Sequence, residues 1–88
     1  MPDEQYRYKP DVLEQLLRHG VRPTGHTAPS LVRDYVRDLY KYEIRRLRER
    51  YVRGDFPKPE YAGRVDALRR QYPVLALHAR ELVDTEGR

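Results

Sequence analysis

Cysteine and tryptophan are absent from this 88-residue sequence, and so is any long apolar run. Without cysteine the chain has no disulfide framework and no thiolate zinc site. A membrane-spanning helix needs about 20 consecutive apolar residues, which the sequence nowhere approaches, and the charged first residues do not resemble a signal peptide. We therefore expect a soluble protein in the reducing cytoplasm.

Apolar material is also scarce for a chain of this size. Hydrophobic residues make up 39% of the sequence and charged residues 36%. Folding removes only about 60 to 65% of the unfolded surface from water in so short a chain. A second subunit would relieve the shortage of buried apolar surface.

Acidic residues are outnumbered, 14 against 18 basic ones, which gives a net charge of +4. Arginine accounts for 15 of the 18 basic residues. Its planar guanidinium suits carboxylate and phosphate partners and stacks on aromatic rings. A GC-rich coding sequence would produce the same bias, so the arginine content alone does not identify a partner.

Helical periodicity, interrupted by proline and glycine, predicts four helices. They span about residues 10–18, 28–53, 59–71 and 73–83. Gly20 and Gly54 suit the ends of the first two helices, because glycine readily adopts the left-handed conformation after a helix. Pro73 separates the last two, since the residue before a proline disfavours helical dihedrals.

The predicted fold is a single all-α domain over residues 1–88, in which the long second helix forms a hairpin with the third. The spacing of Tyr61, Val65, Leu68 and Tyr72 marks the buried face of that third helix. We expect a flexible N-terminal arm at residues 1–9 and a frayed C-terminus at residues 84–88.

The long second helix changes character along its length. Its first half carries a broad apolar arc, wider than one packing partner needs: Leu31, Val32, Tyr35, Val36, Leu39, Tyr40 and Tyr42. In its second half Arg46, Arg50 and Arg53 occupy roughly the same side of the helix. We therefore expect two neighbours to cover the first half and a packed but narrower face in the second.

These features predict a non-enzymatic protein-interaction module whose partner is a second copy of itself or another protein. A homodimer formed through the apolar and tyrosine face of the long helix is the expected form. The predicted binding residues are Tyr35, Tyr42, Arg45, Arg46, Arg50 and Arg53. The alternative is a nucleic-acid-binding protein whose arginines contact phosphates. Only Glu43 and Glu49 lie among these arginines, which leaves most of them without an acidic neighbour in the helix.

No pattern typical of an active site is present. The histidines His19, His26 and His78 lie far apart, and Ser30 is the only serine. Glycine-rich phosphate loops are absent as well. We expect no catalytic residue, metal, cofactor or small-molecule substrate, and no membrane partner.

Overall fold

The computed structural model describes residues 5–84, which form an elongated helical rod of 56 × 19 × 18 Å. Three α-helices are present: α1 (Pro10–Arg18), α2 (Pro29–Val52) and α3 (Lys58–Arg70). Two short 3-10 helices follow, η1 (Pro73–Ala76) and η2 (Ala79–Leu82). The predicted all-α class is confirmed.

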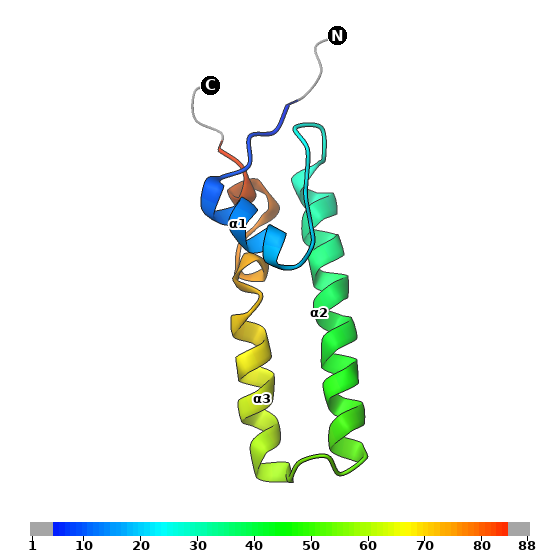
Figure 1. The fold of residues 1–88 in the computed structure, drawn as a ribbon. Helices are drawn as coiled ribbons and strands as arrows, with labels where there is room; N and C mark the ends of the chain where they lie inside the picture. The colour runs from blue at the N-terminus through cyan, green and yellow to red at the C-terminus, as the bar shows by residue number, and fades with distance from the viewer. Residues whose placement is uncertain (1–4, 85–88) are drawn as a thin grey trace.

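Helices α2 and α3 lie side by side and run in opposite directions along the rod (Figure 1). At the turn between them Gly54 has a φ of +88°, a conformation that L side chains rarely adopt. The amide of Asp55 donates to the carbonyl of Arg50 (2.9 Å), which closes the end of α2. The turn therefore sends the chain back along α2 after only a few residues.

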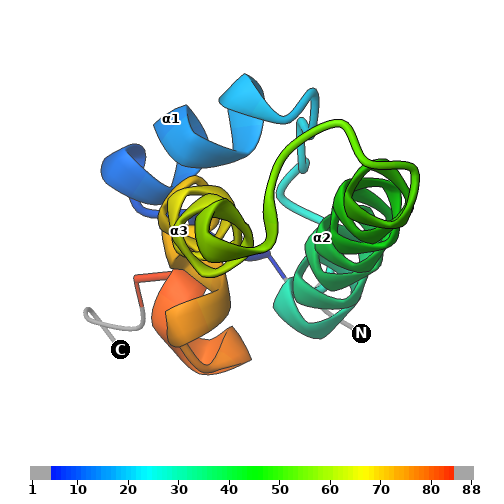
Figure 2. The ribbon, with the colours of Figure 1, turned by 90° about the horizontal axis from the view of Figure 1, so that it is seen from below.

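The two ends of this rod are built differently. At one end, beyond the last turn of α3, the two 3-10 helices pack against α2 and α1 packs against η1 (Figures 1 and 2). We call this the covered end. At the other, which we call the hairpin end, the last turns of α2 and the first turns of α3 continue alone to their connecting loop (Figure 1).

The covered end holds the largest fully buried side chains. These are Leu16, Leu82, Val12 and Val36, contributed by α1, η2 and α2. At the hairpin end the buried residues are fewer, and they include Leu47, Phe56 and Leu68. Burial of a Leu, Val or Phe side chain contributes roughly 1.5 to 3 kcal/mol, so most of the stabilising apolar contact lies at the covered end.

The fourth helix predicted over residues 73–83 is instead the pair of 3-10 helices, joined by extended backbone at Leu77 and His78. Arg33 of α2 provides a physical reason. Its guanidinium donates to the carbonyls of Leu77 (2.7 Å) and Leu75 (2.9 Å), which a continuous helix would use internally. The carboxylate of Glu81 then accepts from the His78 amide at 2.7 Å and starts the second turn.

Residues 5–9, predicted as part of a flexible arm, are docked against the covered end. Tyr8 is buried and forms an isolated antiparallel bridge with Val83. The Lys9 amide donates to the carbonyl of Leu82 (3.1 Å), and the Tyr6 amide donates to that of Gly25 (2.7 Å). Helical or strand periodicity could not predict this docking, because Tyr8 is a single aromatic residue in a segment without a repeating pattern. Asp84, predicted as the first residue of a frayed C-terminus, donates its amide to the carbonyl of Arg7 (2.7 Å). The rest of the predicted ends, residues 1–4 and 85–88, lies outside the described residues.

Candidate protein-interaction surface

A stripe of exposed apolar side chains runs along the first half of α2. Leu31 is 63% exposed, Tyr35 54% and Tyr42 53%. Eleven residues separate the first from the last, and at about 1.5 Å per residue the stripe is roughly 16 Å long. Large apolar side chains gathered along one line of a small protein typically mark an interaction site.

The broad apolar arc predicted on α2 therefore divides into two parts. Its inner part is covered within the chain, since Val32 and Val36 are buried and Leu39 and Tyr40 pack partly against the core. Its outer part is the stripe of Leu31, Tyr35 and Tyr42, hereafter the α2 stripe. Two neighbours were expected to cover this half of the helix. Residues 5–84 cover only the inner part of the arc and leave the outer part exposed.

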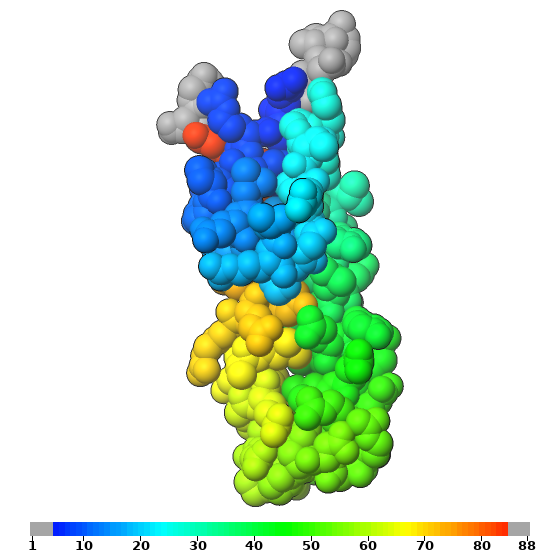
Figure 3. Space-filling model, viewed as in Figure 1, coloured from blue at the N-terminus to red at the C-terminus, as the bar shows by residue number. Residues whose placement is uncertain are grey.

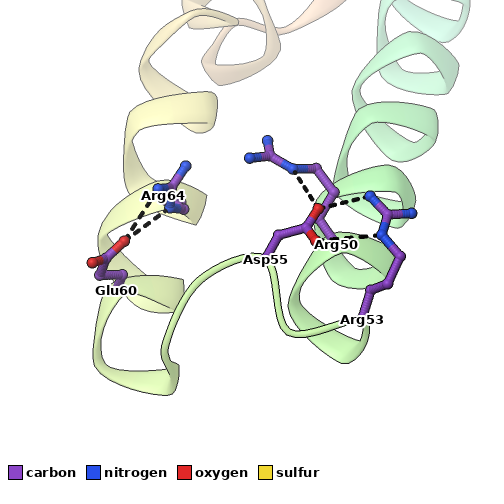
Figure 4. A network of polar contacts seen from close by, with 5 residues as sticks. All are labelled: Arg50, Arg53, Asp55, Glu60 and Arg64. Atoms are coloured by element: carbon purple, nitrogen blue, oxygen red, sulfur yellow. Dashed lines mark hydrogen bonds and ion pairs between the residues drawn. The ribbon is translucent and has the colours of Figure 1, made fainter.

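Two of the four predicted binding arginines are held by an acid that follows the helix. Arg53 binds Asp55 with both nitrogens of its guanidinium edge (2.7 and 3.4 Å), and Arg50 lies 3.6 Å from the same carboxylate (Figure 4). The hydrogen bond from Arg53 lowers the pKa of Asp55 below its ordinary value of 3.8. The expectation that most of the predicted arginines lack an acidic partner is therefore wrong for Arg50 and Arg53, whose partner lies just beyond the helix.

Phe56 explains why Arg50 also has a structural role. This buried ring lies beneath two guanidinium groups, with the Arg64 carbon 4.3 Å and the Arg50 carbon 5.6 Å from the ring centroid. Glu60 in turn binds Arg64 at 3.1 Å (Figure 4). Cation–π contacts and ion pairs thus close the tip of the hairpin. Arg64 was missed in the sequence, because only the returning helix places it beside Arg50.

The other two predicted arginines, Arg45 and Arg46, make no ion pair within residues 5–84, and neither does Arg48. Arg46 instead lies over the ring of Tyr42, 5.9 Å from its centroid. Arg45 and Arg48 flank the highly exposed Val52. The predicted binding residues therefore do not form one cluster: Tyr35, Tyr42 and Arg46 lie together, while Arg45 lies at the edge of a separate hollow.

A groove of about 540 Å³ runs between α2 and α3 on the same side of the pair as α1 (Figure 3). Its floor is apolar, formed by Leu39, Leu47, Ala67 and Leu68. Its rim carries Tyr42, Glu43, Gln71 and three arginines, Arg46, Arg50 and Arg64. We call this hollow the hairpin groove. It begins where α1 ends and follows α2 toward the hairpin tip (Figures 1 and 3).

Where the groove meets the covered end, Tyr72 joins the two parts of the molecule. Its hydroxyl donates to Glu43 of α2, and its ring stacks on His19 at a centroid distance of 4.1 Å. Burial raises the pKa of Tyr72 above its ordinary value, and the bond to Glu43 raises it further. Glu43 is thus already committed to Tyr72 on the groove rim.

The histidines have separate structural positions. His19 Nε2 lies 2.7 Å from the carbonyl oxygen of Gln71, and the His78 backbone caps η2. The His26 amide donates to Thr24 in the loop before α2. Among the described residues no three His, Cys, Asp or Glu side chains gather as metal ligands would.

Comparison of the sequence with protein-family models and curated proteins, and of the structure with solved structures, finds no match. No helix within the described part of the chain has the length and apolar character to cross a membrane. The surfaces above are therefore interpreted from their own geometry.

Proposed function

We propose that this chain is a protein-interaction module that pairs with a second copy of itself through the α2 stripe. The observation that supports this most strongly is the exposure of Leu31, Tyr35 and Tyr42 along one line of a helix whose opposite face is already buried. Tyrosine and leucine side chains at such a line provide the apolar centre that protein interfaces need.

The charges beside the stripe favour a second copy. Asp38 and Arg45 are seven residues apart, which is nearly two helical turns, so they lie on the same edge of α2. If two α2 helices pack antiparallel about a two-fold axis next to Tyr42, Asp38 of each copy faces Arg45 of the other. Because the axis repeats every contact, this arrangement forms two ion pairs on the same edge.

Sedimentation equilibrium between about 1 and 100 µM tests the proposal, because dimerisation follows mass action. We expect the mass of a dimer at the upper end of the range. Tyr35→Glu and Tyr42→Glu should yield folded monomers, whereas Ala62→Glu, at an exposed position of α3, should leave the mass unchanged. Asp38→Arg should weaken the dimer, and adding Arg45→Asp should restore it. A wild-type monomer throughout would refute the proposal.

Nucleic-acid binding is the second candidate, supported by the absence of ion pairs at Arg45, Arg46 and Arg48 within residues 5–84. Binding through phosphates falls steeply with salt, with one counterion released for roughly each contact. Anisotropy of a labelled mixed-sequence duplex at about 50 and 200 mM salt measures this dependence. Loss of most binding at the higher salt would favour this function, and no binding at the lower would remove it.

A further inference from the structure

We propose that the hairpin groove binds an acidic amphipathic helix of a different partner protein. The groove shares Tyr42 with the α2 stripe but otherwise has its own residues, and the inference does not rest on the dimer. It starts from the side of the rod on which α1 lies, because this side differs between the two ends. At the covered end α1 occupies that side, and at the hairpin end the groove continues beyond α1 with no element of residues 5–84 over it (Figures 1 and 3).

The floor of the groove is suited to the apolar face of a helix. Leu47 and Leu68 are buried and Leu39 is half-buried, whereas Ala67 of α3 is exposed. A small residue at this place lets another helix approach closely. Leu39 and Arg50, at the two ends of the groove on α2, are separated by about 16 Å of helix, which corresponds to roughly three turns of a bound helix.

The rim determines the charge of the occupant. Three guanidinium groups line the groove against one carboxylate, and that carboxylate, Glu43, accepts a hydrogen bond from Tyr72. Arg46 has no ion pair within the described residues. Arg50 and Arg64 each pair with a single acid and retain further N–H donors, since a guanidinium has five. Glutamate or aspartate on both flanks of an apolar helix face would complement this rim.

The same charges argue against a second copy as the occupant of the groove. Two grooves packed face to face would bring Arg46, Arg50 and Arg64 of one copy against those of the other. Like charges brought together in a partly desolvated interface are strongly unfavourable. The mixed charges beside the α2 stripe favour self-association there, whereas the net positive charge of the groove favours a different, acidic partner.

The test uses a synthetic, fluorescein-labelled peptide of about 15 residues, with leucine at every third or fourth position and glutamate on both flanks, so that it is helical and amphipathic. A second peptide carries lysine in place of each glutamate. Fluorescence anisotropy measures their binding to the full-length protein. We expect the glutamate peptide to bind with a Kd below about 100 µM and the lysine peptide to show no binding in this range.

Two pairs of variants locate the binding site. Ala67→Trp fills the groove, and Ala62→Trp places the same side chain on the other side of α3. Arg46→Glu reverses a rim charge, and Arg48→Glu makes the same change in charge on the other side of α2. Each groove variant should weaken the glutamate peptide by at least about tenfold, and each control should change it by less than about twofold.

The proposal is overturned if the glutamate peptide does not bind, if both peptides bind equally, or if the groove variants bind it as well as their controls. It is also overturned if a mixed-sequence DNA duplex, rather than the peptide, loses binding on Arg46→Glu but not on Arg48→Glu. Sedimentation separates this test from the dimer: an Ala67→Trp protein that is still a dimer but has lost peptide binding supports the groove, and a wild-type protein that is monomeric but binds the peptide refutes only the self-association.

Discussion

The covered end and the hairpin end share the long helix α2 but stabilise it in different ways. At the covered end, α1, the 3-10 helices and residues 5–9 surround α2 and bury Leu16 and Leu82 completely. At the hairpin end, α2 and α3 have only each other and a latch of charged and aromatic side chains at the tip. The first arrangement resembles a small protein core, and the second leaves surface that a partner can cover.

This difference shows where the scarce apolar residues of the chain are used. The buried core of the covered end is completed within the chain, and only Leu31 and Tyr35 of the α2 stripe remain exposed beside it on α2. The hairpin end instead presents an apolar floor between charged rims. In a protein with so little hydrophobic material, leaving that floor open costs stability, which is consistent with a surface retained for binding.

The largest expected difference between the two ends comes from the same substitution at two leucines. Leu16→Asp places a carboxylate in a fully buried site without a cationic partner, and we expect it to abolish folding. Leu68→Asp places the carboxylate at the groove floor, where solvent and the nearby Arg64 can stabilise it. That variant should remain folded with a lower melting temperature, as circular dichroism would show.

Equal loss of structure in the two aspartate variants would contradict the distinction between the ends. The sequence alone predicts unfolding for both Leu39→Asp and Leu68→Asp, because it assigns both leucines to the core. The structure confirms that Leu68 is buried in the core cluster, although it also lines the groove, and it places Leu39 half-buried against that cluster. Leu39→Asp therefore serves as a second test of the same point.

A smaller effect is expected at the junction. Tyr72→Phe removes the hydrogen bond to Glu43 while keeping the ring that stacks on His19. The loss should be about 0.5 to 1.5 kcal/mol in the free energy of unfolding, measured by urea denaturation. Because the folded pKa of Tyr72 is raised, the wild type should also lose stability as the pH rises above 10, and Tyr72→Phe should lose less. Identical urea midpoints for the two proteins would show that the bond contributes nothing.

The ion pairs of Asp55 with Arg50 and Arg53 at the hairpin tip should have the smallest effect on stability, with a characteristic pH dependence. Arg53 lowers the pKa of Asp55 below 3.8 in the folded protein. The stabilisation is therefore complete above the ordinary pKa and is lost as the pH falls through the folded value. Asp55→Asn should lower stability slightly at neutral pH and reduce the further loss on acidification below about pH 4. Thermal melts of both proteins from neutral to acidic pH measure this, with Asp66→Asn as the control on α3. An unchanged acid response in Asp55→Asn would contradict the assignment.

Part of this structure could be predicted from the sequence, because it depends on local signals. The three α-helices follow from periodicity bounded by Pro10, Gly20, Pro29, Gly54 and Pro73. What the sequence did not reveal depends on contacts between distant residues. The 3-10 helices arise where Arg33 takes two carbonyls more than 40 positions away, and Tyr8 docks through its bridge to Val83.

The candidate surfaces also differ in whether they depend on local sequence signals or on contacts between distant residues. Helical spacing alone places Leu31, Tyr35 and Tyr42 on one side of α2, although it cannot show which part of the apolar arc is covered. The role of Asp55 could have been suspected, since a residue directly after a helix-ending glycine can fold back onto the last turn. The groove could not, because its rim combines Arg46 and Arg50 of α2 with Arg64 of α3. The dimer, the nucleic-acid alternative and the cytoplasmic location all remain predictions.

Native-state hydrogen exchange tests the central distinction most directly, because local opening reflects how many buried contacts hold each segment. In the protein without a partner, the amides of α2 residues 32–40 should exchange much more slowly than those of residues 44–52, and the start of α3 should exchange as fast as the latter. Uniform protection along the whole of α2 would contradict the account, because the hairpin end would then be as stable as the covered end.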